Sequence, residues 1–309
     1  MKSKKVIGII FLVFTIIVWG ITFLATKALL VDFKPMEIML FRFGLSFIGM
    51  FLLYPKIFKW QGWKVELLCL LASIAGITAY QSLENVAILY ANGSFVSIII
   101  STASFFTAIF SRIILKNKGI RINYYIGFVI SLVGIILISL NGTEKLNIKP
   151  LGVFISIVCA VLWGLYSVLV DLIGKYKLNL VQTTRRIMLD AFILIVPLFF
   201  ITGGKFEIAR FAKIENVVWI VFLGVLASAI CFYTWNYCVS ALGTVTTSYG
   251  VLVQPIVTIV VGAIWFEEKF TWVSCIGVSL ILIGLYIALF IKKKIKEVNE
   301  CELEVTKND

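Results

Sequence analysis

The chain has 309 residues, of which 61% are apolar and only 14% are charged, and it contains no histidine. Its mean hydropathy of +1.04 is far above that of soluble domains and indicates that the folded chain is surrounded by lipid. The formal net charge of +12 comes from lysines and arginines that cluster between apolar runs, where they fix membrane orientation, so we expect no nucleic-acid partner.

The cysteines do not form a recognisable site. All six lack CxxC spacing, and five lie inside apolar runs, where cysteine acts as a small hydrophobic residue. Without histidine or paired cysteines, a zinc or haem centre lacks its ordinary ligands. We therefore expect neither a metal nor a cofactor.

Apolar runs follow one another along the whole chain, and about 20 apolar residues of helix are enough to cross a bilayer. The first run follows three lysines, as a signal peptide would, but it is long enough to span and has a copy later in the chain. We therefore predict an all-α membrane protein with ten transmembrane helices, at residues 6–28, 35–54, 65–88, 94–115, 121–140, 151–171, 180–202, 215–240, 245–266 and 271–291.

Lysine and arginine are unevenly divided between the two sides of this topology. Fifteen lie near span ends on the side of both termini, including Lys56, Lys59, Lys118 and Lys177, whereas seven lie on the other side. Positively charged loops stay in the cytoplasm. We therefore expect a multi-pass protein of the cell membrane with both termini cytoplasmic.

The second half of the chain repeats the first. Leu162-Trp163-Gly164 repeats Val18-Trp19-Gly20, and Arg186 matches Arg42 at the same offset. Further matches pair Asn85 with Asn236, and Gly127 and Gly134 with Gly277 and Gly284. A repeat of five spans must insert its second copy upside down, which is the plan of many secondary transporters with a substrate site near the midplane. We expect two inverted five-helix repeats, residues 1–145 and 146–291, and a cytoplasmic tail at 292–309.

Several short motifs occur in a specific order: the two Trp-Gly pairs, Pro35 followed by Arg42, the segment from Ala87 to Ser94, and Glu268-Lys-Phe-Thr271. Over residues 6 to 291 this pattern resembles the EamA-like family of the drug/metabolite transporter superfamily. The resemblance implies a ten-helix basket whose cavity is lined mainly by spans 1, 3, 4, 6, 8 and 9. It also implies transport of amino acids, other metabolites or xenobiotics.

Two positions depart from that family. Ser104 stands where the family usually has a proline in span 4, and Asn117 and Lys118 stand where it has an acidic residue after that span. We therefore expect the first half to bend differently from the second, in which Pro255 is present.

Substrate-binding candidates are polar or aromatic side chains within the spans. Trp19 and Trp163 lie in span interiors, where an aromatic belt at the bilayer surface does not account for them. Two interpretations remain open for all the candidates: they line a central cavity, or they pack helices and cap helix ends near the bilayer surface. The full set is Trp19, Thr22, Tyr80, Glu84, Asn85, Trp163, Tyr166, Trp235 and Asn236.

Charged residues within spans are the candidates for coupling transport to an ion gradient. Asp190 lies near the middle of span 7, and Arg186 precedes it by one helical turn, close enough for an ion pair. The pair is either structural or a site that couples transport to a proton or to the substrate. Arg42, at the matching place in span 2, either extends outward along its long side chain or attracts anionic substrate groups.

Three kinds of activity compete. A secondary carrier, an exporter of small metabolites, amino acids or drug-like solutes, fits best because neither a nucleotide-binding loop nor a soluble domain is present. A membrane-embedded enzyme would need a cluster of catalytic residues, and a channel would need rings of charge or filter carbonyls. We therefore expect neither catalytic residues nor an enzymatic activity, and the oligomeric state stays open.

Overall fold

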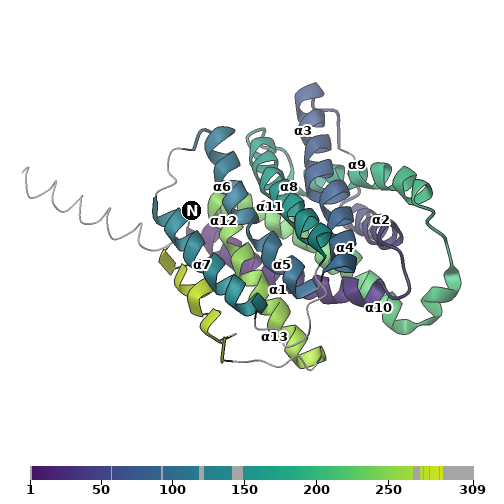
Figure 1. The fold of residues 1–309 in the computed structure, drawn as a ribbon. Helices are drawn as coiled ribbons and strands as arrows, with labels where there is room; N and C mark the ends of the chain where they lie inside the picture. Colours follow the sequence, from purple (N-terminus) through teal and green to yellow (C-terminus); the bar gives the residue numbers. More distant parts are fainter. Residues whose placement is uncertain are drawn as a thin grey trace, which may run out of the picture.

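The computed structural model describes residues 2–56, 58–91, 93–117, 122–140, 149–266, 272–273, 275–277, 279–284 and 286–287. In these ranges all regular secondary structure is helical, and the helices form one bundle (Figure 1). Seven helical stretches of the described chain are long and apolar enough to cross a membrane. The prediction of an all-helical membrane protein is confirmed, whereas the number of ten crossings stays a prediction.

The described helices cover the first nine predicted spans. In the first half these are α1 (Lys2–Leu29), α2 (Pro35–Leu53), α3 (Trp63–Ser73) with η1 (Ile74–Thr78) and α4 (Ala79–Tyr90), α5 (Gly93–Ser101) with α6 (Ala103–Ile113), and α7 (Ile122–Leu140). In the second half they are α8 (Pro150–Gly174), α9 (Leu180–Ile201), η2 (Ile208–Ala212), α10 (Ile214–Val221) with η3 (Phe222–Ile230) and α11 (Cys231–Leu242), and α12 (Thr244–Ser248) with η4 (Tyr249–Val253) and α13 (Gln254–Phe266). The predicted tenth span is described only as helical turns between residues 272 and 287.

Local sequence accounts for the helix starts. Pro35 and Pro150 each occupy the first position of a helix, where a missing backbone N–H costs nothing. At the start of α2 the Glu37 carboxylate also accepts a hydrogen bond from the N–H of Lys34 at 2.8 Å. The α9 stretch is the least apolar of the long helices because it carries Arg185, Arg186 and Asp190.

Spans 4 and 9 are both interrupted, but by different chemistry. In span 9 a 3₁₀ segment, η4, precedes Pro255, whereas in span 4 the helix breaks at Thr102 without a proline. The hydroxyls of Ser101 and Thr102 instead donate to the carbonyls of Ile98 and Ile99, each at 2.6 Å. Such bonds compete with the helical ladder and bend it. The α-helix is therefore interrupted at matching places in the two halves, and in the first half hydroxyl groups bond to the backbone there.

The two halves pack against each other through equivalent helices. Helix α1 of the first half contacts α11 of the second, and the equivalent helix α8 of the second half contacts α4 of the first. Helix α2 also packs directly on its equivalent, α9. A β-carbon on Gly134 would lie 2.5 Å from the carbonyl oxygen of Gly277, and one on Gly284 would clash with the carbonyl oxygen of Gly127. These glycines therefore form a packing surface on which the two backbones come close together.

The glycine of each Trp-Gly pair is needed for the same reason in both halves. A β-carbon on Gly20 would lie 2.6 Å from Val257 in span 9, and one on Gly164 would lie 2.8 Å from Phe106 and from the backbone nitrogen of Thr107 in span 4. Glycine is therefore required for these close approaches.

Candidate functional site

Aromatic rings from four spans meet at the centre of the bundle. The indoles of Trp19 and Trp163 lie edge to face with ring centres 5.0 Å apart, and Trp235 lies 5.2 Å and 5.3 Å from them. Tyr80 and Tyr166 each lie 5.0 Å from Trp163. All five side chains are buried, and edge-to-face or offset contacts of this kind are favourable. The two repeated tryptophans therefore contact each other at the centre of the bundle.

Polar groups line a small pocket beside these rings. Its walls include the predicted residues Trp19, Thr22, Tyr80, Glu84, Trp163 and Arg42, together with Gln81 and Gln254. The enclosed volume is about 10 Å³, close to the space of one water molecule. Glu84 is only 2% exposed, so the structure places it on the pocket wall and not as a cap at an exposed helix end.

Arg42 is held inside the bundle. Its side chain is 1% exposed and donates from Nε to Ser228 Oγ at 2.6 Å and from Nη1 to Gln81 Oε1 at 2.8 Å. The alternative in which Arg42 extends outward is therefore wrong, because hydrogen bonds from η3 and α4 direct the guanidinium inward. It shares the pocket with Glu84, an opposite charge.

The two repeated asparagines each bind the start of a neighbouring helix. Asn236 donates to Thr184 Oγ1 at 2.9 Å and accepts from the hydroxyl of Tyr166 at 2.9 Å. Asn85 donates to the carbonyl of Pro35 at 3.3 Å. Both are buried but neither lines the central pocket, so the structure gives them contacts between helices.

Arg186 joins two carboxylates. Its Nε lies 3.1 Å from Asp190, as predicted, and its Nη2 lies 3.0 Å from Glu66 in the first turn of α3. Both carboxylates are buried, whereas Arg186 is about one third exposed. Arg42 is not part of this group, so the three predicted coupling residues lie in two separate places. Arg185 donates to the carbonyls of Tyr54 and Lys56 and thereby closes the end of α2.

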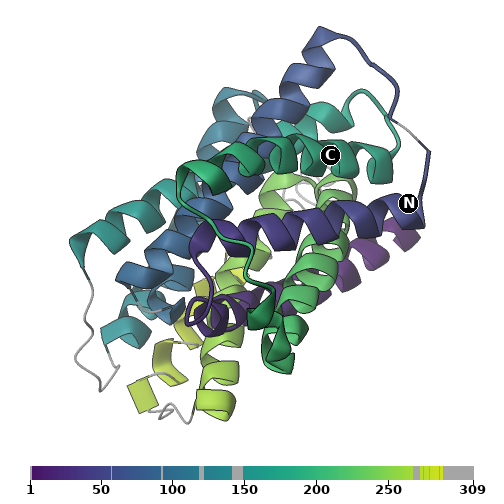
Figure 2. The same ribbon diagram turned by 90° about the vertical axis from the view of Figure 1, so that its right-hand side faces the viewer.

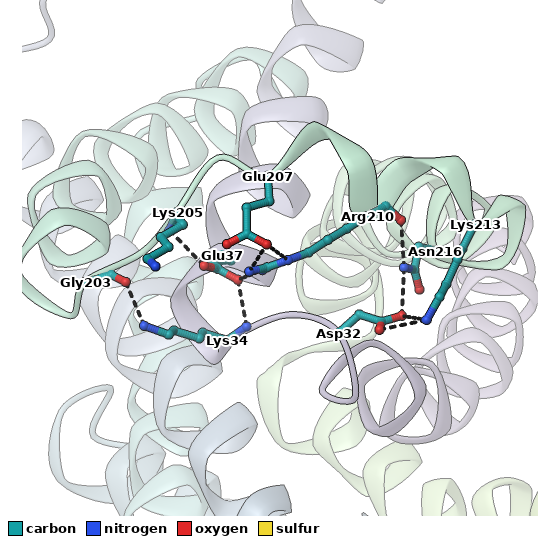
Figure 3. Close-up of polar contacts among 9 residues, drawn as sticks. All are labelled: Asp32, Lys34, Glu37, Gly203, Lys205, Glu207, Arg210, Lys213 and Asn216. Atoms are coloured by element: carbon teal, nitrogen blue, oxygen red, sulfur yellow. Dashed lines mark hydrogen bonds and ion pairs between the residues drawn. The ribbon is translucent and has the colours of Figure 1, made fainter.

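A second polar network, which we call the polar strap, ties the connection between α9 and α10 to the start of α2. Figure 2 shows this connection crossing the face of the bundle, and Figure 3 shows the contacts. Glu37 is fully buried and accepts from the backbone N–H of Lys205 at 2.8 Å and from Arg210 at 2.6 Å. Arg210 also pairs with Glu207 at 2.8 Å.

The strap has a second, more exposed part. Asp32 accepts hydrogen bonds from the Lys213 ammonium at 2.8 Å and from Asn216 at 3.0 Å (Figure 3). These bonds hold the pKa of Asp32 below its usual value of 3.8, since they favour the charged carboxylate.

The EamA-like transporter family model matches this chain twice, over residues 6–140 and 150–290. The chain belongs to the EamA-like transporter family. The predicted resemblance is thus confirmed, and two matches in one chain agree with the internal repeat.

Relatives of this EamA-like protein carry transporter names. An uncharacterized transporter of Archaeoglobus fulgidus is 26% identical over 284 residues, covering 91% of this chain and 98% of the relative. A probable amino-acid metabolite efflux pump of Escherichia coli is 22% identical over 287 residues, covering 89% and 92%. A crystal structure with a TM-score of 0.72 and 17% identity covers 96% of this chain and 99% of its own, and it shows that the fold is shared.

Sequence reasoning missed several residues of this EamA-like site. Glu66 was not singled out, although it is a carboxylate at the edge of a predicted span. Gln254 and Ser228 were also missed; Gln254 donates to the carbonyl of Trp19 at 3.2 Å. A polar residue beside Pro255 within an apolar run was an available signal for Gln254. No sequence signal identified Ser228.

Proposed function

We propose that this protein is a secondary transporter that moves a small metabolite, an amino acid or a drug-like solute across the cell membrane by alternating access. The observation that carries the proposal is the central pocket, in which Trp19 and Trp163 from the two halves meet beside the opposite charges of Arg42 and Glu84. Buried charges inside a membrane bundle are costly and are typical of substrate or ion pathways. Small molecules bind mostly apolar pockets with a few oriented polar groups.

The topology belongs to this proposal. Ten helices in two inverted repeats, with boundaries at residues 145 and 291, are supported by the exchanged helix pairs and by the reciprocal glycine contacts. In such folds the site between repeats opens to each side in turn. Both termini and the positively charged connections are placed in the cytoplasm.

The polar groups of the pocket favour solutes with both charged and apolar parts. Arg42 provides donors for an anionic group, Glu84 an acceptor for a cationic one, and the indole faces suit apolar, aromatic or cationic bodies. Trp235 packs behind the pocket wall against Trp19 and Trp163, and its indole N–H is buried without a hydrogen-bond partner among the described residues. The name of the Escherichia coli relative supports export as the direction.

Coupling is assigned to Asp190 and Arg186; Glu66 contacts the same arginine but is given no part in proton transfer. One arginine between two buried carboxylates leaves an excess negative charge. If the contact of Asp190 with Arg186 breaks in one access state, the carboxylate loses its counter-charge there and takes up a proton. Proton movement would then be linked to the conformational cycle.

Solute counterflow in liposomes tests the proposed activity. Vesicles containing the purified protein are loaded with an unlabelled amino-acid or metabolite mixture, and uptake of labelled members is measured. A carrier accelerates exchange of unmodified solute. Flux without exchange acceleration would indicate a channel, and recovery of a modified solute would indicate an enzyme, so either result contradicts the proposal.

A further inference from the structure

A second, larger pocket is lined by the end of α8, the connection from α8 to α9, and the start of α9. Residues of α11 form the rest of its lining. Its volume is about 540 Å³, within the range of roughly 300 to 1,000 Å³ that small-molecule sites occupy. We call it the α8–α9 pocket. Its residues Asp171, Lys175, Lys177 and Ser240 belong to the ends of spans placed on the cytoplasmic side, and the central pocket shares no lining residue with it.

The charges of this pocket are unbalanced. Lys175 and Lys177 line it together with one carboxylate, Asp171, which already accepts a hydrogen bond from Thr244 at 2.6 Å. Lys177 is held in a left-handed conformation, with a φ of 53°, by a turn in which its N–H donates to the carbonyl of Gly174 at 3.1 Å. The turn fixes the backbone from which this lysine extends. The pocket therefore has an excess of positive charge, which a bound anionic group would neutralise.

The remaining walls are amphipathic. Aliphatic side chains, among them Ile173 and Ile187, line the pocket together with Tyr233 and Tyr237. Tyrosine provides an apolar ring with a polar tip, and such walls suit an aliphatic or aromatic body. The lining therefore suits a small organic anion that also has an apolar part.

Direct contacts connect this pocket to the central one. Asn236 lines the α8–α9 pocket, is 2% exposed, and accepts a hydrogen bond from the hydroxyl of Tyr166 at 2.9 Å. The ring of Tyr166 lies 5.0 Å from Trp163, which lines the central pocket. A continuous series of contacts thus runs from Asn236 through Tyr166 to Trp163, from the wall of one pocket to the wall of the other.

We propose that the α8–α9 pocket is a loading site that binds a small organic anion with an apolar body before the anion passes to the central pocket. The inference rests on the proposed function, which places this end of the bundle in the cytoplasm. Displacement of Tyr166 from Asn236 opens the route between the two pockets.

Ligand-observed ¹⁹F NMR tests the site without requiring transport. The probes are 4-fluorophenylacetate and its uncharged analogue 4-fluorophenylacetamide, added to the purified full chain in phosphatidylcholine nanodiscs. The anion is expected to bind at least about ten-fold more tightly than the amide, because only the anion pairs with the lysines. Equal binding of the two probes, or no binding of the anion, overturns the proposal.

Variants locate the bound probe. Lys175→Gln with Lys177→Gln is expected to weaken binding of the anion by about five-fold or more and to leave the amide unchanged. Lys64→Gln, an exposed lysine outside the pocket, is the matched control and should have no effect. Ser240→Trp fills the pocket from an exposed position and should abolish binding. If the anion no longer binds to Gln254→Leu but still binds to Ser240→Trp, the probe occupies the central pocket and the proposal is overturned.

Lipid binding by the lysines and failure of the carrier activity are tested separately. Repeating the titration in phosphatidylglycerol nanodiscs shows whether the lysines serve lipid phosphates; abolished probe binding there overturns the proposal, and retained binding supports it. Counterflow is measured on the same preparations. Binding with the predicted variant pattern but without counterflow would reject the carrier and keep the site, whereas counterflow without that pattern would reject the site alone.

Discussion

The indole Nε1–H of Trp19 in α1 donates a hydrogen bond to the backbone carbonyl of Ala227 at 2.8 Å. Ala227 lies in the π-helical segment η3, where the i to i+5 pattern changes the ordinary pairing of carbonyls. A carbonyl of span 8 thereby fixes the orientation of a central aromatic ring. This bond couples the backbone of one half to the candidate site contributed by the other.

Replacing Trp19 by phenylalanine should remove this bond while keeping an aromatic ring. We expect the free energy of unfolding to fall by about 1 kcal/mol or more, because the carbonyl of Ala227 loses its buried partner, and counterflow to slow. Denaturant unfolding in detergent and the counterflow assay measure the two effects. Trp63→Phe is the control, since Trp63 is 81% exposed. Equal losses in both variants would contradict a specific role.

Replacing Asp190 by asparagine keeps the shape of the side chain and removes its titration. The variant should bind and exchange solute but lose any accumulation driven by a pH gradient. Glu66→Gln is the matched variant, because it removes the other carboxylate on Arg186 and keeps the Asp190 ion pair. We expect it to retain gradient-driven accumulation. Full accumulation by Asp190→Asn would show that this carboxylate is structural.

Replacing Gly164 by alanine places a methyl group against the backbone of Thr107, which cannot move cheaply. We expect a loss of about 1 to 3 kcal/mol in the free energy of unfolding, as for other overpacked contacts. Gly49→Ala is the control, because nothing lies within 4 Å of its added β-carbon. That variant should be neutral or slightly stabilised, since alanine favours a helix. Unfolding of both variants in detergent would measure the difference.

The Asp32 contact predicts a pH dependence of stability. Because its folded pKa is lowered from 3.8, its stabilisation is fully present above that value and is lost as the pH falls through the folded pKa. The wild type should therefore unfold at a higher temperature than Asp32→Asn at about pH 6, with the difference shrinking below about pH 4. Thermal unfolding at several pH values tests this. A difference that does not change with pH would mean that the charge of Asp32 contributes nothing.

The orientation is tested by cysteine accessibility in a background without the six native cysteines. Single cysteines at Lys59, Lys118 or Lys177 should resist an impermeant reagent added outside intact cells, whereas one at Lys213 should react. Lys118 lies outside the described residues, so its assignment depends on the sequence alone. Labelling at Lys118 or Lys177 from outside would reverse the topology.

The first nine helix ranges and the equivalence of Trp19 with Trp163 could be predicted from the sequence because both follow from patterns along the chain. Apolar run length sets the spans, and internal repetition marks residues that are equivalent in the two halves. The contact of Arg186 with Asp190 followed in the same way from helical spacing.

The partners that were missed depend on how each helix is rotated toward its neighbours. Glu66 reaches Arg186 from α3, and Ser228 reaches Arg42 from η3. Both contacts join residues far apart in the sequence. The π-helical segments η1 and η3 add a residue to the turn and change which side chains face inward, and an apolar run gives no sign of such a change.

The reciprocal contact of Gly134 with Gly277 and of Gly284 with Gly127 has a consequence for how the chain is assembled. A contact in which each side presents the same residues to the other has the form of an isologous homodimer interface, here inside one polypeptide. The peptide link between the halves then acts by raising their effective concentration and does not define the contact. A chain cut between residues 140 and 150 and expressed as two fragments should therefore reassemble into an active carrier.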